Sequence, residues 1–257
     1  TGFTAPESQT VRLNSSLNYV DFYYTRNSYM LTWNIGDGTA SGSYTGGGFV
    51  KYGAVITPPI LTKMGYSYTW DKPVAETMPA ADAAYTAVWT ANTNTAYKVE
   101  HYRQNANDNG YTLHETETLS STTDTSVTAV EKTYTGFTCN PDANGTVASG
   151  TIAADGSLIM KLYYDRSTYT VTYVSDGTQY GDIITFRYGA AVPAPAAPVK
   201  AGYSFNSWLL DGQTFSGIMP GKNIELTAKW LAGSKSYTIR YYKENLSGGY
   251  EEPETAV

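Results

Sequence analysis

Residues 224–230 read Ile-Glu-Leu-Thr-Ala-Lys-Trp, so apolar and polar side chains alternate along the stretch. Because side chains two positions apart point to the same face of a β-strand, this pattern predicts a strand with one buried and one wetter face. The same alternation runs through residues 169–173 and 158–164. Strands are therefore the element from which we expect the fold to be built.

Turn signals separate the alternating stretches, among them Asp155-Gly156, Asp176-Gly177 and Asn144-Gly145. Such pairs favour tight turns between strands. No window carries a long apolar stripe of helical period, and the best candidates for short helices are residues 127–135 and 60–64. We predict small antiparallel or mixed sheets, each accompanied by at most one short helix.

The chain repeats itself with a long period. The motif Tyr23-Tyr24-Thr25-Arg26 returns as Tyr163-Tyr164-Asp165-Arg166, and the offset is 163 − 23 = 140 residues. Each period holds two alternating units of about 70 residues, a size that folds independently. The predicted boundaries give a C-terminal part of one unit type at 1–26, the second type at 27–90, the first at 91–166, the second at 167–231, and an N-terminal part of the first at 232–257.

Composition excludes several classes of protein. The chain has 17 Lys and Arg against 23 Asp and Glu, a net charge of −6, which argues against a nucleic-acid partner. It has no apolar run long enough to span a membrane. A single cysteine excludes an intrachain disulfide framework and a multi-cysteine zinc site. Since residue 1 is threonine and neither a signal peptide nor a sorting tail is present, we expect a piece of a longer or processed protein.

Two sets of motifs carry resemblances to known families. The second unit type contains Tyr169-Thr170-Val171, Tyr188-Gly189, Gly202-Tyr203-Ser204-Phe205 with Trp208, Met219-Pro220 and Ala228-Lys229-Trp230. It resembles the internalin-type B repeat, also called the Listeria–Bacteroides repeat. The first unit type contains Tyr97 to Tyr102, Gly110-Tyr111, Gly136-Phe137-Thr138 and Tyr163-Tyr164-Asp165-Arg166. It resembles the mucin-binding-protein (MucBP-like) repeat.

The resemblances imply a fold and a location. Both families are known as β-grasp (ubiquitin-like) modules of long surface proteins, mainly in Gram-positive bacteria. We therefore expect a β-rich α+β fold with tandem small β-grasp modules in an elongated array. The expected location is extracellular, at the cell surface and associated with the cell wall.

The two copies of the second unit differ at one point. One residue separates Tyr68 from Trp70, whereas two separate Phe205 from Trp208. Because a shift of one residue reverses the face of a strand, either Trp208 follows a bulge or a strand end, or the two tryptophans have different environments. Trp89 and Trp230 are expected to occupy equivalent buried positions.

Little in the sequence supports catalysis, and we expect no catalytic, cofactor-binding or metal-binding residues. Of the two histidines, His101 follows a strand pattern and His114 reads as a surface residue. Residues 105–110, Asn-Ala-Asn-Asp-Asn-Gly, offer oxygen ligands but lack the terminal glutamate of a calcium loop, so a hairpin turn is the expectation. Cys139 is expected to be a small, at least partly buried residue rather than a nucleophile.

Tyrosines are the most informative candidates for ligand contact. Neighbours on a strand face opposite ways, so one member of each adjacent pair is expected at a surface or an interface. The candidates are Tyr24, Tyr102, Tyr164 and Tyr242. Such rings either stack on sugars or pack across strands and against the next module, and we favour packing.

We predict a non-catalytic segment of a bacterial surface protein that serves as a stalk or adhesion module. The alternatives are a carbohydrate-binding module for host glycan or mucin and an accessory region of a surface enzyme. Expected partners are a host glycan or a surface protein. Residues 1–26 and 237–257 each carry half of a unit, so head-to-tail self-association of the chain is also predicted.

Overall fold

The computed structural model describes residues 1–12, 15, 19–252 and 254–255. The chain divides into two compact units. The first contains residues 1–101, 114–130 and 141–162, and the second contains residues 102–113, 131–140 and 163–257.

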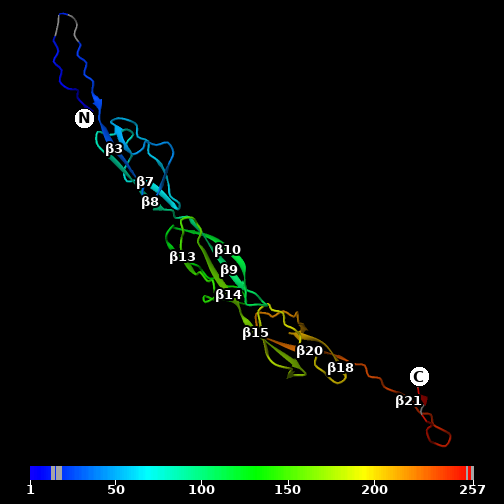
Figure 1. Ribbon diagram of the computed structural model, residues 1–257. Helices are drawn as coiled ribbons and strands as arrows, with labels where there is room; N and C mark the ends of the chain where they lie inside the picture. The colour runs from blue at the N-terminus through cyan, green and yellow to red at the C-terminus, as the bar shows by residue number, and fades with distance from the viewer. Residues whose placement is uncertain (13–14, 16–18, 253, 256–257) are drawn as a thin grey trace. The chain divides into compact units, whose positions relative to one another are not determined.

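The first unit contains a four-stranded sheet of order β5-β3-β8-β7, whose strands are visible in Figure 1. Its strands are β3 (Ser28–Asn34), β5 (Gly48–Lys51), β7 (Tyr66–Trp70) and β8 (Ala83–Ala91). The central pair, β3 and β8, is parallel, and the outer strands are antiparallel to their neighbours. A two-stranded sheet of β4 (Thr39–Ser41) and β6 (Ile60–Thr62) is formed by the segment that connects β3 to β8.

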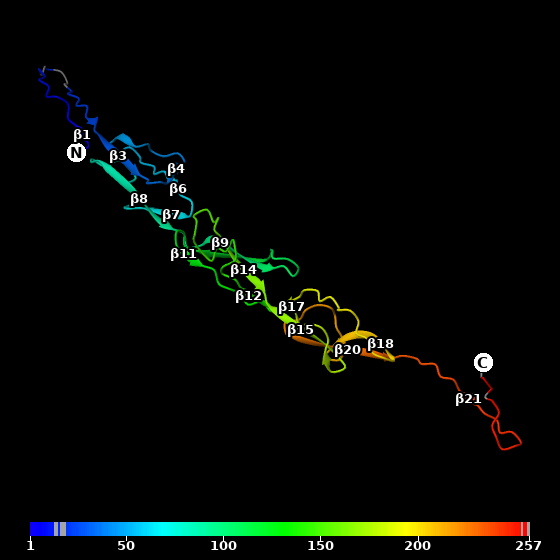
Figure 2. The ribbon, with the colours of Figure 1, turned by 60° about the horizontal axis from the view of Figure 1, so that its bottom comes forward.

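The second unit contains a sheet of the same plan. Its strands are β15 (Thr168–Ser175), β16 (Thr178–Gln179), β17 (Ile184–Arg187), β18 (Tyr203–Leu210), β19 (Gln213–Thr214) and β20 (Ile224–Ala232). Again the central pair, β15 and β20, is parallel, while β17 and β18 pair antiparallel on either side. Figures 1 and 2 both show β15, β20 and β18 side by side.

A different four-stranded sheet has the order β10-β9-β14-β12. Its strands are β9 (Thr95–Gln104), β10 (Tyr111–Ser121), β12 (Phe137–Cys139) and β14 (Ile159–Arg166). The remaining strands form three separate pairs: β1 (Phe3–Thr4) with β2 (Thr25–Arg26), β11 (Ser126–Thr128) with β13 (Ser149–Thr151), and β21 (Arg240–Tyr241) with β22 (Glu254–Thr255).

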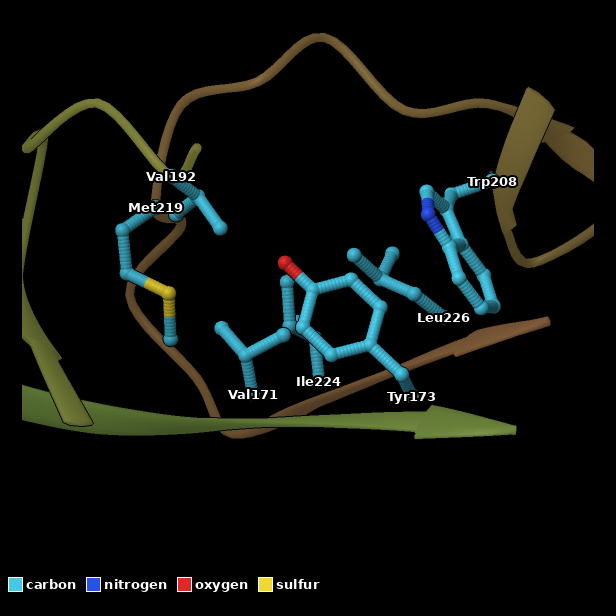
Figure 3. Close-up of a cluster of buried hydrophobic side chains, with 7 residues drawn as sticks. All are labelled: Val171, Tyr173, Val192, Trp208, Met219, Ile224 and Leu226. Atoms are coloured by element: carbon cyan, nitrogen blue, oxygen red, sulfur yellow. The ribbon is translucent and has the colours of Figure 1, made fainter. Parts of the chain in front are cut away.

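The two parallel-centred sheets share five buried sequence positions. The buried residues of the first are Leu31, Ile56, Met78, Ala83 and Tyr85, and their counterparts in the second are Val171, Val192, Met219, Ile224 and Leu226. In Figure 3, side chains of β15 and β20 rise from the sheet toward Val192 and Met219 on the covering segment. Ala83 and Tyr85 on β8 correspond to Ile224 and Leu226 on β20. One small and one large side chain thus fill a volume similar to that of two side chains of medium size.

The prediction of a β-rich α+β fold with β-grasp modules is wrong, because no helix occurs among the described residues. Residues 60–62 form β6 and residues 126–128 form β11, where the two helix candidates were expected to begin. Proline and glycine disfavour a helix in the segment before β8, which contains Pro58-Pro59 and three consecutive glycines at 46–48. Residues 127–135 are rich in β-branched valine and threonine, which favour extended backbone.

A bulge in β18 explains the unequal spacing of the tryptophans. The pairing of β18 with β20 shifts register at Asn206. Trp208 therefore lies opposite Ala228, just as Trp70 lies opposite Ala87 in the first sheet. The first alternative, a bulge before Trp208, is confirmed. Burial still differs, because Trp208 is buried and Trp70 is half-buried.

Trp89 and Trp230 occupy equivalent positions, opposite Tyr68 and Phe205. The expectation that they are buried is wrong, because both are half-buried near the ends of their strands. Trp89 Nε1 donates a hydrogen bond of 3.1 Å to the carbonyl oxygen of Ile35. The buried residues of these two final strands lie nearer their beginnings: Ala83 and Tyr85 on β8, and Ile224 and Leu226 on β20.

Candidate functional site

A packed cluster connects strands β12 and β14 to the loop after β17. The ring of Phe137 meets the ring of Tyr188 edge-on, with centroids 6.0 Å apart. Arg166 lies over the Phe137 ring, 4.8 Å from its centroid, and donates a hydrogen bond of 2.7 Å from Nη1 to the carbonyl oxygen of Tyr188. We call the cluster of Gly136, Phe137, Arg166, Tyr188 and Gly189 the joint.

Close contacts and a left-handed backbone together favour glycine at both glycine positions of the joint. Gly136 has a φ of +78°, and a Cβ added there would lie 2.2 Å from Cδ1 of Tyr188. A Cβ on Gly189 would lie 2.9 Å from Nη1 of Arg166. The ring and the guanidinium group therefore occupy the space that any side chain at these positions would need.

The same joint occurs a second time, at residues 2–53. Its members are Gly2, Phe3, Arg26, Tyr52 and Gly53. Phe3 and Tyr52 meet edge-on with centroids 5.6 Å apart, and Arg26 Nη1 donates a hydrogen bond of 2.8 Å to the Tyr52 carbonyl oxygen. Sequence reasoning identified the repeated Tyr-Gly pair but not its arginine partner. The arginine that ends both Tyr-Tyr-x-Arg motifs was the available signal.

A second repeated cluster lies beside β7 and β18. In the first sheet, Lys63 forms an ion pair of 3.0 Å with Asp37 and lies 4.0 Å from the centroid of the Tyr66 ring. The hydrogen bond from Lys63 lowers the pKa of the Asp37 carboxyl. Asp37, Lys63 and Tyr66 line an open hollow of about 520 Å³. The counterparts in the second sheet are Asp176, Lys200 and Tyr203.

The four predicted ligand-contact tyrosines have different environments. Tyr24 and Tyr242 are exposed. Tyr102 is half-buried and stacks on Tyr163, with centroids 4.9 Å apart. Tyr164 is buried, and its hydroxyl oxygen accepts a hydrogen bond of 3.0 Å from the Lys132 backbone N–H, so it has no surface to offer a ligand. The structure does not bring the four together.

The two histidines and the Asn/Asp-rich residues 105–110 occupy the structural positions that the sequence predicts. His101 is buried on β9, with Nε2 3.1 Å from Oε2 of Glu117, and His114 is exposed, so both predictions are confirmed. Residues 105–110 form the predicted turn, in which Asp108 accepts hydrogen bonds from Asn105 Nδ2 and the Gly110 N–H. The hydrogen bond from Asn105 is the main cause that lowers the pKa of Asp108.

The described residues hold no group of three or more His, Cys, Asp or Glu side chains placed to bind a metal ion. Nor do they contain a helix with the length and apolar character needed to cross a membrane.

Cys139 lies half-buried on β12. Burial, with the nearby Glu131 carboxylate as a further cause, raises the pKa of the thiol to about 11. The thiol is therefore protonated near neutral pH, and a protonated thiol is a poor nucleophile.

We expect Cys139 in the folded protein to react with a thiol reagent at pH 8 on the order of 100-fold more slowly than an unperturbed cysteine, because about two units of pKa reduce the thiolate fraction by that factor. Labelling kinetics followed by mass spectrometry measure the rate. Protein unfolded in urea serves as the control, and Glu131→Gln should accelerate labelling. Equal rates in the folded and unfolded protein would contradict this expectation.

The second parallel-centred sheet overlaps a stretch of residues that matches a known protein family. Residues 169–229 match the family model of the Listeria-Bacteroides repeat domain. The matched residues thus extend from β15 into β20, and they include Tyr188 and Gly189 of the joint and the buried Trp208. Domains of this kind occur in bacterial surface proteins. The match includes neither residues 27–90 nor residues 91–166, and the chain matches no curated protein.

Proposed function

We propose that this chain is a stalk segment of a cell-wall-associated bacterial surface protein, in which two kinds of module alternate. Residues 27–90 are the second Listeria-Bacteroides repeat in this proposal. Support comes from the shared sheet plan, with β3 parallel to β8 as β15 is to β20, and from the five matched core positions. Residues 91–166 are the other module, for which the mucin-binding-protein-like motifs are the support.

The repeated joint is the observation that carries the proposal. A stalk requires contacts that fix the orientation of each module relative to its neighbour. Without such contacts, modules joined by a linker move independently. Both joints use an aromatic edge contact, an arginine-to-carbonyl hydrogen bond and closely approached glycines. Such contacts favour coupled modules over modules on flexible linkers.

Backbone ¹⁵N relaxation of the full chain tests this coupling. We expect residues of β12 and β14 to show the same rotational correlation time as residues of β15 and β17, because the joint holds them together. Fast independent tumbling of the two groups, with low order parameters at Ser167, would overturn the stalk proposal.

Adhesion through a glycan is the second candidate function. The hollow lined by Asp37, Thr39 and Tyr66 combines a carboxylate, a hydroxyl and an aromatic ring, which is the chemistry that recognises a sugar. A glycan array probed with the full chain tests it. We expect Asp37→Ala to reduce binding about tenfold, the loss that accompanies a hydrogen bond to a charged group. Asp211→Ala, on an exposed turn, is the control, and a chain that binds no glycan contradicts this function.

A further inference from the structure

A small pocket lies beside Trp208 in the second parallel-centred sheet. Its volume is about 280 Å³. Tyr173 of β15, Trp208 of β18 and Leu226 of β20 line it from the sheet, and Val192 lines it from the segment between β17 and β18. The volume is close to the lower limit of about 300 Å³ for pockets that hold small molecules, so a ligand of this pocket is small.

The pocket contains a hydrogen-bond donor that the protein leaves unpaired. Trp208 is 6% exposed, and its buried Nε1 has no hydrogen-bond partner among the described residues. Figure 3 shows the nitrogen-bearing edge of the indole turned toward Val192, which also lines the pocket. Because a buried N–H without an acceptor is destabilising, native proteins usually satisfy it with a protein group, a water molecule or a ligand.

The first parallel-centred sheet uses larger side chains at the equivalent positions. Trp33 lies opposite Tyr85, as Tyr173 lies opposite Leu226. The rings of Trp33 and Tyr85 stack with centroids 5.2 Å apart, and Trp33 Nε1 donates a hydrogen bond of 2.8 Å to the carbonyl oxygen of Thr45. The second sheet carries the smaller member at both positions, which leaves room under its covering segment.

The bulge in β18 places polar side chains at the same pocket. The extra residue, Asn206, lines the pocket together with Ser207, whose Oγ donates a hydrogen bond of 3.2 Å to Asn206 Oδ1. The pairing of β7 with β8 in the first sheet has no such register shift. Bulges are frequent next to functional sites, where they redirect side chains.

The lining residues restrict the chemistry of the ligand. Aromatic rings of Tyr173, Phe205 and Phe215 line the pocket with Trp208, and such rings pack well against another ring. None of the described residues that line the pocket is charged, so a charged ligand would lose its hydration without gaining a partner. The indole N–H is a donor only, so the ligand has to supply an acceptor.

We propose that this pocket binds an uncharged aromatic molecule that carries a carbonyl oxygen. The ligand ring packs among the aromatic side chains, and its oxygen accepts a hydrogen bond from Trp208 Nε1. The site uses no residue of the joint, so it is independent of the stalk proposal and its failure would leave that proposal standing.

Indole N–H signals in ¹H–¹⁵N spectra of the full chain test the proposal, with acetophenone as the probe. The chain has five tryptophans, and Trp208→Phe assigns the Trp208 signal by its loss. We expect acetophenone to shift this signal to higher ¹H frequency in a saturable manner, because the proton gains an acceptor. Ethylbenzene has a similar shape without the oxygen and should bind about tenfold more weakly.

Three variants locate the binding. Ala194 is exposed and lines the pocket, so Ala194→Leu should fill part of the space and weaken acetophenone binding about tenfold. Ala197→Leu, at an exposed position of the same segment outside the lining, is the matched control and should bind as the wild type does. In Trp208→Phe, acetophenone followed at the Leu226 amide should bind no better than ethylbenzene.

Three outcomes would overturn the proposal. One is a Trp208 signal that acetophenone does not shift up to its limit of solubility, as expected if only water occupies the pocket. Another is equal affinity for acetophenone and ethylbenzene, which would mean that the indole N–H plays no part. The third is equal binding by Ala194→Leu and Ala197→Leu, which would place the probe elsewhere on the protein.

Discussion

Replacing Trp208 with alanine should lower the free energy of unfolding of the Listeria-Bacteroides repeat domain by about 3–5 kcal/mol. Trp208 is buried, and three aromatic rings surround it: those of Tyr173 at 4.8 Å, Phe205 at 5.3 Å and Tyr180 at 5.9 Å between centroids. Removing the indole leaves a cavity that the sheet and its covering segment cannot fill. The loss approaches the whole stability of a domain of this size.

Hydrogen exchange of the amides of β15 and β20 measures this loss directly, because these strands open only when the sheet unfolds. Val199→Ala, at an exposed position in the same domain, is the control and should change stability by less than about 0.5 kcal/mol. A loss of a few tenths of a kcal/mol for Trp208→Ala would show that the ring is not part of the core.

Replacing Gly136 with alanine should open the joint. The left-handed backbone at φ +78° costs about 1–2 kcal/mol for a residue with a Cβ. The added Cβ also overlaps the Tyr188 ring near its attachment point, which costs about 1–3 kcal/mol more because the ring must move as a whole. Urea unfolding should report the loss, and ¹⁵N relaxation should show that β12 and β17 no longer move together.

Gly181 provides the matched control for Gly136. It has a φ of +75°, but a Cβ there meets nothing within 4 Å, so Gly181→Ala should cost only the backbone part. Adding Tyr188→Ala to Gly136→Ala should recover part of the loss by removing the overlap. Equal losses for Gly136→Ala and Gly181→Ala would mean that the ring does not occupy this space.

Strand positions were predictable from the sequence because alternation reports burial directly. The stretch from Ile224 to Trp230 falls within β20, and its buried members, Ile224 and Leu226, are apolar positions of that pattern. The repeat was also predictable, since it depends only on matching motifs. Side-chain partners across the joint were not, because Arg166 and Tyr188 are 22 residues apart and no local pattern links them.

Two predictions were wrong because local sequence does not report how deeply a strand residue is buried or what structure connects two strands. Trp230 continues the apolar alternation of β20, yet it lies near the end of the strand and is only half-buried. Residues 60–64, a candidate for a short helix, lie in the segment that connects the parallel strands β3 and β8. Here extended segments and turns supply the buried Ile56 and Met78 instead.

The joint has a consequence for how such a gene changes length. Each joint takes Phe137 and Arg166, or Phe3 and Arg26, from one kind of module and the Tyr-Gly pair from the other. A duplication of about 70 residues would place two surfaces of the same kind against each other, without a matching partner. A duplication of the 140-residue period, the offset from Tyr23 to Tyr163, brings a complete joint with it. Copy number in this protein is therefore expected to vary by module pairs.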